Sequence, residues 1–474
     1  MKILDFGAVG IGALAVVWAV FGGDISGRSV IAQPQVSASF DYDAANAAYE
    51  NGDYDTTLRL VSRPAENGDP VAQNFLGVLH NYGHGVEEDD VEAVRLFRLS
   101  AEQGFAKGQD ALGTMLMAGA GTDRDLDEAR YWLERSAAQG LPDGQYKLGF
   151  LLVRHPRDND DLARGISMLR TASDAGSTSA MTELAGCYRM GLGVTPDPAS
   201  AMLLLSKAAY LGSAEAMYMT GNMFYFGEGG IPQKVQAANW FEHAANEGHL
   251  EAKRRFGRML AHGDGIQKDF ERGATLVLEA AEAGYAAAQF DFGQMFYFSG
   301  QMDQAFLWIS RAADQGYAPG LNTLAEMYKD GSGMAPDPRK AAELYRLSAE
   351  QDNPTGLLAY GEMLLAGTGV DENIEEGLDY LIRASEHNHG QAQFLLARLY
   401  HGSGDMVEID HERAYFFYRL AETGVYYNYA NMGDFSETQA DKLAENELSA
   451  EQLARQDARI AEWRSRLPAY NNRI

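Results

Sequence analysis

Cysteine is almost absent from this sequence: Cys187 is the only one in 474 residues. A single cysteine excludes an intrachain disulfide, a cysteine-based zinc cluster and a CxxC redox pair. Basic residues are also scarce, since 39 Lys and Arg stand against 67 Asp and Glu, for a formal net charge of −28. Such a charge disfavours nucleic acid, anionic lipid surfaces and acidic polysaccharides as primary partners, and it favours a basic partner.

Long hydrophobic runs are confined to the N-terminus, where residues 6–23 carry no charge. One interpretation is a signal peptide with a small-residue cleavage site at Val30-Ile31-Ala32. The other is a membrane anchor, because the run approaches the roughly 20 residues that span a bilayer. Both predict an exported protein, either periplasmic or anchored in the inner membrane and facing the periplasm. We expect a signal peptide or transmembrane anchor in residues 1–25 and a linker in residues 26–40.

Glycine, by contrast, is abundant, with 51 residues, and it recurs with a period. Nine of ten successive intervals in one loop column are 36 residues long and one is 32. The two members that are not glycine are Asp and Asn, which also tolerate a left-handed backbone, so the column predicts helix C-terminal stops. Each unit then contains two antiparallel helices. The column is Gly68, Gly104, Gly140, Gly176, Gly212, Gly248, Gly284, Gly316, Asp352, Asn388 and Gly424.

Small residues form further columns inside the expected helices. A column restricted to Gly and Ala predicts that another helix backbone approaches closely, because glycine inside a helix costs about 1 kcal/mol relative to alanine. Small-against-large packing of this kind stacks helical pairs into a superhelix. The first column runs Gly77, Gly113, Gly149, Ala185, Gly221, Gly257, Gly293, Ala325, Gly361, Ala397, and the second runs Ala72, Gly108, Gly144, Ala180, Ala216, Ala252, Ala288, Gly320, Gly356, Ala392. A third, on the second helices, runs Ala101, Ala137, Ser173, Ala209, Ala245, Ala281, Ala313, Ala349, Ser385, Ala421, and the expected large partners are Leu96, Trp132, Met168, Leu204, Trp240, Leu276, Trp308, Leu344, Tyr380 and Phe416.

The starts of the second helices carry a further column of capping residues. Asp and Asn are strong N-caps, and the connection that precedes them usually contains Gly-x-Gly. The expected caps are Asp89, Asp125, Asp161, Asp197, Asp269, Asp337 and Asn373.

This pattern resembles the Sel-one-like repeat (SLR) family, a branch of the tetratricopeptide superfamily with a longer loop between its helices. The resemblance rests on Leu76-Gly77, Gly83-His84-Gly85-Val86, Asp89, Ala93 and Ala101-Glu102-Gln103-Gly104, and it extends over ten units in residues 71–426. Three departures stand out: His155-Pro156-Arg157 replaces Gly-x-Gly in the third unit, the seventh (287–318) lacks four loop residues, and the tenth carries Arg413. The resemblance implies an all-α, right-handed α-solenoid of antiparallel helix pairs whose first helices line the concave face. We expect a shorter tetratricopeptide-like hairpin in residues 41–70 and C-terminal capping helices in residues 427–474.

Three sets of residues could carry chemistry in principle: Cys187, the histidine pairs His80/His84 and His387/His389, and Asp123-x-Asp125-x-Asp127. Cys187 falls in a column otherwise filled by Leu and Met, which predicts a buried apolar residue. His80 and His389 occupy positions where other units place aromatic residues or histidine. The acidic triplet lacks the glycine that a calcium loop requires, and helix capping explains it better. Since GxSxG, P-loop and HExxH motifs are also missing, we expect no catalytic residue, no cofactor and no metal.

A partner-binding surface is the remaining candidate. Two aromatic triplets, Phe224-Tyr225-Phe226 and Phe296-Tyr297-Phe298, occupy the same register near the ends of first helices. Phe224 and Phe296 belong to the core column, whereas the others exceed what neighbouring units place there. Exposed aromatic residues are typical anchors for a peptide. The predicted contact residues are Tyr225, Phe226, Tyr297, Phe298 and His262, and the alternative is that the aromatic residues pack under the shortened seventh loop.

The sequence therefore predicts an exported, non-catalytic scaffold that binds a protein or peptide, preferably a basic one, on its curved helical surface. Membrane association would come from the N-terminal apolar segment if it is not cleaved. An alternative is a role in assembly or regulation of the bacterial cell envelope or of exopolysaccharide. Hydrolysis of β-lactams is less favoured, because the cysteine-rich relatives associated with it rely on disulfide-paired repeats that are absent here.

Overall fold

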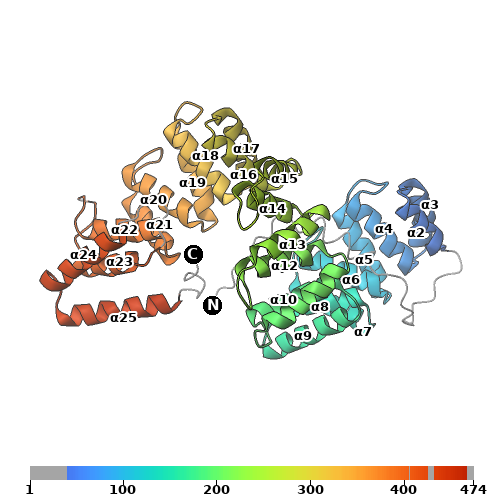
Figure 1. The fold of residues 1–474 in the computed structure, drawn as a ribbon. Helices are drawn as coiled ribbons and strands as arrows, with labels where there is room; N and C mark the ends of the chain where they lie inside the picture. The colour runs from blue at the N-terminus through green and yellow to red at the C-terminus, as the bar shows by residue number, and fades with distance from the viewer. Residues whose placement is uncertain (1–39, 405, 425–431, 467–474) are drawn as a thin grey trace. The chain divides into compact units, whose positions relative to one another are not determined.

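The computed structural model describes residues 40–404, 406–424 and 432–466, and within these ranges all regular structure is helical (Figure 1). The expected all-α fold is confirmed. The chain divides into two compact units, one ending at His249 and the other starting at Leu250. Each consists of consecutive antiparallel helix pairs.

Unit 1 begins with a hairpin of α2 (Tyr42–Glu50) and α3 (Tyr54–Glu66) and continues with five helix pairs. Its first helices are α4 (Pro70–Tyr82), α6 (Ala106–Ala118), α8 (Pro142–Arg154), α10 (Thr178–Met190) and α12 (Ala214–Phe226). Its second helices are α5 (Asp90–Glu102), α7 (Leu126–Ala138), α9 (Asn159–Asp174), α11 (Pro198–Tyr210) and α13 (Lys234–Asn246).

Unit 2 contains five further pairs, followed by two helices that pack against the last pair. Its first helices are α14 (Leu250–His262), α16 (Ala286–Phe298), α18 (Ala318–Asp330), α20 (Pro354–Ala366) and α22 (Gly390–Tyr400). Its second helices are α15 (Phe270–Glu282), α17 (Met302–Asp314), α19 (Pro338–Glu350), α21 (Ile374–Glu386) and α23 (His411–Ala421), and the final two are α24 (Met432–Asn446) and α25 (Ala450–Arg466).

The helix stops adopt the left-handed backbone that the loop column predicts. Even the two members with side chains do so, since φ is 54° at Asp352 and 59° at Asn388. Gly424 is the exception, because its φ lies outside the left-handed region. A Cβ at Gly424 would lie 2.6 Å from the Cα atom of Gly390, so a close approach between helix ends explains this glycine.

The small-residue columns mark close packing, but the whole column of expected large partners is off by one residue. A Cβ at Gly221 would lie 2.6 Å from the ring of Phe241, and one at Gly257 would lie 2.7 Å from the carbonyl oxygen of Gly273. The large residue facing the first column is therefore the one after the predicted partner. Backbone atoms of the second helix also approach this column, most closely where that helix carries a glycine, as at Gly273. The facing residues are buried throughout: Phe97, Leu133, Leu169, Leu205, Phe241, Val277, Ile309, Tyr345, Leu381 and Phe417.

The second column faces the preceding unit. A Cβ at Gly108 would lie 3.1 Å from the backbone nitrogen of Ala101, and one at Gly356 would lie 2.8 Å from that of Ala349. Ala101 and Ala349 belong to the third column, so the predicted close approach of backbones is confirmed between successive units.

The predicted N-cap residues are confirmed at all but one position. Asp89, for example, accepts a hydrogen bond from the backbone N–H of Glu92 at 2.9 Å. The prediction was wrong at Asp161, because the irregular third unit starts its second helix earlier, at a cap formed by Asp158. Asp161 lies in the first turn of α9, where it is buried and pairs with Arg130 at 2.7 Å. The other caps are Asp125, Asp197, Asp269, Asp337 and Asn373.

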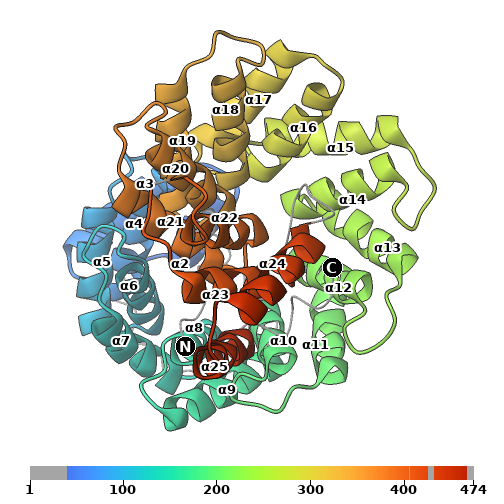
Figure 2. The same cartoon turned by 90° about the vertical axis from the view of Figure 1, so that its left-hand side faces the viewer.

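First helices are layered on one side of each unit. Successive first helices contact one another in unit 1, and so do α14 with α16 and α18 with α20 in unit 2, whereas successive second helices pack less closely throughout the described ranges. In Figure 2, α6, α8, α10 and α12 accordingly lie inside α7, α9, α11 and α13. The first-helix layer is therefore the inner side of the curve in each unit.

Candidate partner-binding surface

One side of each first helix faces away from its second helix. In α14, for example, Gly257 packs against α15. Positions 2, 6, 9 and 13 of this 13-residue helix lie together on another side, because residues three or four apart are neighbours on a helix surface. We call these four positions the inner stripe. In unit 2 it comprises Glu251, Arg255, Arg258 and His262 on α14, Ala287, Asp291, Gln294 and Phe298 on α16, Pro319, Thr323, Glu326 and Asp330 on α18, and Thr355, Ala359, Glu362 and Ala366 on α20.

Three of the five predicted contact residues lie on the inner stripe. Phe226 occupies position 13 of α12 in unit 1, and its exposed fraction is 42%. His262 and Phe298 occupy position 13 of α14 and α16 in unit 2, where His262 is exposed and the exposed fraction of Phe298 is 80%. Phe298 is thus not covered by the shortened seventh loop.

The other two predicted residues are half-buried and belong mainly to the packing of their own repeats. The Tyr225 ring lies 6.4 Å from that of Phe241, and the ammonium group of Lys234 lies 5.4 Å from the Tyr225 ring centre. Tyr297 packs against the core cluster that contains Ile309. Tyr297 therefore contributes to packing within its own repeat.

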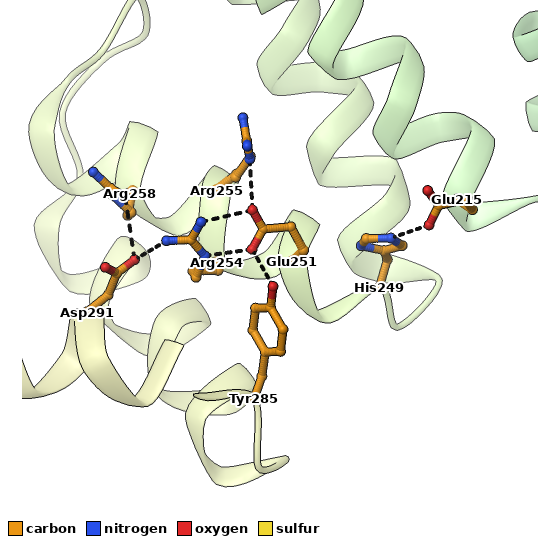
Figure 3. A network of polar contacts seen from close by, with 8 residues as sticks. All are labelled: Glu215, His249, Glu251, Arg254, Arg255, Arg258, Tyr285 and Asp291. Carbon is orange, nitrogen blue, oxygen red and sulfur yellow. Dashed lines mark hydrogen bonds and ion pairs between the residues drawn. The ribbon is translucent and has the colours of Figure 1, made fainter. Parts of the chain in front are cut away.

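Sequence reasoning missed a network of charges on α14 and α16 (Figure 3). Glu251 accepts hydrogen bonds from the Nε atoms of Arg254 at 2.6 Å and Arg255 at 2.9 Å, and from the hydroxyl of Tyr285 at 3.0 Å. Arg254 also donates to Asp291 at 2.7 Å. Burial alone would raise the pKa of Glu251, but the two guanidinium groups outweigh it and lower the pKa to about 2. The network therefore stays ionised and ties α14 to α16.

Arg258 stands at the edge of this network. Its nearest carboxylate oxygen, on Asp291, is 3.7 Å away, beyond hydrogen-bonding distance, and half of its side chain is exposed. A half-exposed guanidinium of this kind can still bind an incoming carboxylate.

Unit 1 carries the same arrangement with its charges exchanged. Asp110 and Lys147 occupy the positions on α6 and α8 that Arg254 and Asp291 occupy on α14 and α16, and their Oδ2 and Nζ atoms are 2.6 Å apart. Asp143 lies nearby, and burial raises its pKa to about 6. The sequence signal for both networks is a charged residue, Asp110 or Arg254, at a first-helix position where other repeats place Tyr146, Phe290 or Leu358. This signal does not show which residues form the ion pairs.

The residues weighed for chemistry occupy structural positions. Cys187 is buried as predicted, and burial raises the pKa of its thiol to about 12. The His84 ring stacks on that of Tyr54 at 4.2 Å, and burial lowers the pKa of His389 to about 4. Asp125 caps α7. In the part of the chain that the structure describes, no three His, Cys, Asp or Glu side chains are placed to hold a metal ion.

The apolar segment of residues 6–23, predicted to be a signal peptide or anchor, lies outside the described residues. Among the helices that are described, none is both long enough and apolar enough to cross a membrane.

The fold and its inner stripe define a helical-repeat protein of the tetratricopeptide-like class. More specifically, the chain belongs to the Sel1 repeat family, whose repeat matches residues 70–105, 106–141, 178–213, 214–249, 250–285, 286–317, 318–353, 354–389 and 390–423. The predicted family is confirmed. In the unmatched third unit His155-Pro156-Arg157 replaces Gly-x-Gly, although α8 and α9 still form its helix pair.

Several solved structures are similar to this chain. One, a protective antigen present in uropathogenic Escherichia coli strains displaying an SLR fold, is 24% identical with a TM-score of 0.51 and aligns over 88% of this chain and 91% of its own. A Sel1 repeat protein from Oxalobacter formigenes is 26% identical with a TM-score of 0.46, over 51% of this chain and 100% of its own. Comparison with curated protein sequences found no match. Repeats of this family generally form non-catalytic scaffolds that bind proteins or peptides.

Proposed function

We propose that this protein is an exported scaffold that binds a protein or peptide partner on the inner stripe of its first helices. The observation that carries this proposal is the exposure of large aromatic side chains on that stripe, above all Phe298. Burial of an exposed aromatic side chain on binding is favourable, because each Å² of apolar surface removed from water contributes about 25 cal/mol of free energy. Aromatic residues of this kind are enriched among the anchors of protein interfaces.

The charges on the stripe support binding over catalysis. In the networks around Glu251 and Asp110, acids and bases neutralise one another at 2.6–2.9 Å. Paired charges of this kind hold helices in place, and they leave few groups for proton transfer or nucleophilic attack. The one thiol of the chain, Cys187, is buried within α10.

The proposal includes export, to the periplasm or to the periplasmic face of the inner membrane. It rests on the uncharged run in residues 6–23. Cell fractionation followed by mass measurement of the purified chain tests it. A mass that lacks residues 1–32 indicates a cleaved signal, an intact chain in the membrane fraction indicates an anchor, and an intact chain in the cytosol contradicts export.

Site-specific photo-crosslinking in the native host tests the binding surface. A benzophenone side chain placed at Phe298, on α16, should capture a discrete partner. The matched control is Leu307 on the neighbouring second helix α17, a large apolar residue with an exposed fraction of 42%. In unit 1 the corresponding pair is Phe226 on α12 and Tyr210, the last residue of α11, whose exposed fraction is 93%. Equal capture at inner and outer positions would count against the proposal.

A further inference from the structure

The inner stripe of α14 carries a guanidinium group without a carboxylate of its own. Among the described residues, the carboxylate oxygen nearest to Arg258 is Oδ2 of Asp291, at 3.7 Å from Nη1. That oxygen already accepts a hydrogen bond from Arg254 at 2.7 Å (Figure 3). Half of the Arg258 side chain is exposed, against 12% of that of Arg254, and Arg258 makes no hydrogen bond to any described residue. Its N–H donors are therefore available to a partner.

The charges around Arg258 are positive in excess. Within the described residues, the ion pairs of α14 and α16 join three guanidinium groups to two carboxylates: Arg254, Arg255 and Arg258 to Glu251 and Asp291. This part of the stripe is thus positive, although the chain has a net charge of −28. Guanidinium groups bind carboxylates through paired N–H donors, so an incoming carboxylate is the group that this excess favours.

An exposed aromatic side chain lies on the same stripe. Phe298 is seven residues beyond Asp291, which is two helical turns and about 10 Å along α16. Both residues lie on one side of the helix, and the exposed fraction of Phe298 is 80%. His262 lies one turn beyond Arg258 on α14, so both helices present charged residues first and rings further on. A carboxylate at Arg258 and an apolar group at Phe298 would therefore be about 10 Å apart.

We propose that the inner stripe of α14 and α16 binds a segment of the protein partner that carries an acidic and an apolar side chain, with Arg258 binding the carboxylate and Phe298 the apolar group. The inference rests on the proposed function and specifies its partner. In a polyproline II conformation, residues three apart lie on the same side and about 9 Å from one another. An acidic residue three positions from an apolar one therefore fits the stripe.

The surroundings favour a short acidic segment over a long polyanion. The inner stripes of the next two first helices, α18 and α20, carry Glu326, Asp330 and Glu362. A nucleic acid or an acidic polysaccharide that extended along the stripe from Arg258 would be repelled by these carboxylates. A free inorganic anion would gain nothing from Phe298, whereas a segment with one carboxylate and one apolar side chain contacts both.

Fluorescence anisotropy with the full chain tests this inference. The probe is a rhodamine-labelled, C-terminally amidated decapeptide with two copies of Gly-Glu-Gly-Ser-Phe, and its counterpart carries glutamine in place of both glutamates. The wild type should bind the glutamate peptide at least about tenfold more tightly than the glutamine peptide, as expected for hydrogen bonds between charged groups. Arg258→Gln should remove this preference, and Arg258→Glu should shift it toward a peptide with lysine in place of glutamate.

The matched control is Arg346→Gln. Arg346 lies on the second helix α19, its side chain is exposed to a similar degree, 44% against 50%, and it also pairs with a carboxylate, that of Glu350. This variant should keep the preference within about twofold, because exposed charges at a distance are screened by salt. Phe298→Ser should weaken the binding of both peptides by about threefold or more, because the apolar contact does not depend on charge. All replaced side chains are at least 44% exposed, so the melting curves by circular dichroism should coincide.

Three results would overturn the inference. They are equal binding of the two peptides by the wild type, equal losses in Arg258→Gln and Arg346→Gln, and displacement of the glutamate peptide by citrate without any effect of Phe298→Ser, which indicates a site for small anions. If photo-crosslinking at Phe298 captures a partner equally well in the Arg258→Gln variant, the proposed scaffold stands and this carboxylate site fails.

Discussion

Replacing Lys147 by methionine should destabilise unit 1 by about 3 kcal/mol, because it leaves Asp110 buried without its partner. The Lys147 and Asp110 side chains have exposed fractions of only 7% and 6%, and the ion pair that joins them is 2.6 Å long. Breaking a buried ion pair from one side costs about 3–5 kcal/mol. Lys107, which also lowers the pKa of Asp110, partly compensates, so we expect the lower end of that range.

The double variant D110L/K147M separates the ion pair from the packing around it. Replacing both partners by apolar residues of similar size is often neutral, so we expect the double variant to lie within about 1 kcal/mol of the wild type. The two single replacements should therefore couple by about 2 kcal/mol or more in a double-mutant cycle.

The penalty of Lys147→Met should also depend on pH. Burial raises the pKa of Asp110, so the folded state binds a proton more readily than the unfolded state does. Stability then falls as pH rises through the folded pKa, and the loss in Lys147→Met should be smaller at pH 5 than at pH 8.

The assay is urea unfolding of the full chain, with amide hydrogen exchange in α6 and α8 as the local readout, because repeat proteins need not unfold in one step. A penalty below about 1 kcal/mol at pH 8, or no coupling between the two positions, would refute the account of this pair.

Three further perturbations test other parts of the structure. Gly221→Val should cost about 1–3 kcal/mol in urea unfolding, because even a Cβ there meets the ring of Phe241 at 2.6 Å. Asp352→Ala should be less stable than Asp352→Gly by about 1 kcal/mol, since both lose the same side chain and only alanine is strained at a φ of 54°. Arg455 and two glutamine amides on α25 lower the pKa of Glu412 from 4.5 to about 2. Glu412 should therefore hold α25 in place at neutral pH and release it as the pH falls between those two values. Hydrogen exchange in α25 should then increase in acid, and Glu412→Gln should abolish this dependence.

Each of these has a result that contradicts it. Wild-type stability in Gly221→Val means that α12 and α13 do not pack as described. Equal stability of the two Asp352 variants means that the helix stop is not left-handed. Acid-dependent exchange in α25 that persists in Glu412→Gln assigns the effect to another carboxylate.

Much of the fold follows from local backbone chemistry. A residue that must adopt a left-handed conformation is restricted in type, so Asp352 and Asn388 could be placed in the same column as the glycines. The close approach at Gly108 could be predicted because no side chain fits there. Where the backbone imposes no such restriction, the sequence is less informative: Leu96 and Phe97 are both large and buried, and periodicity alone did not show which one faces Gly77.

The candidate surface was predicted only in part. The exposed positions of Phe226 and Phe298 could be predicted because aromatic residues in equal register stand out against their neighbours. The ion pairs were missed because partners such as Asp110 and Lys147 are 37 residues apart and become neighbours only when first helices stack. Asp161 was misassigned for a related reason, since the irregular loop of the third unit shifts the cap to Asp158 and frees Asp161 to pair with Arg130.

The most direct test of the account is hydrogen exchange on the protein bound to the partner that photo-crosslinking identifies. The account predicts that added protection concentrates on first helices, with α16, which carries the exposed Phe298, the most affected in unit 2. Protection confined to second helices such as α15, α17 and α19, with the first helices unchanged, would contradict it.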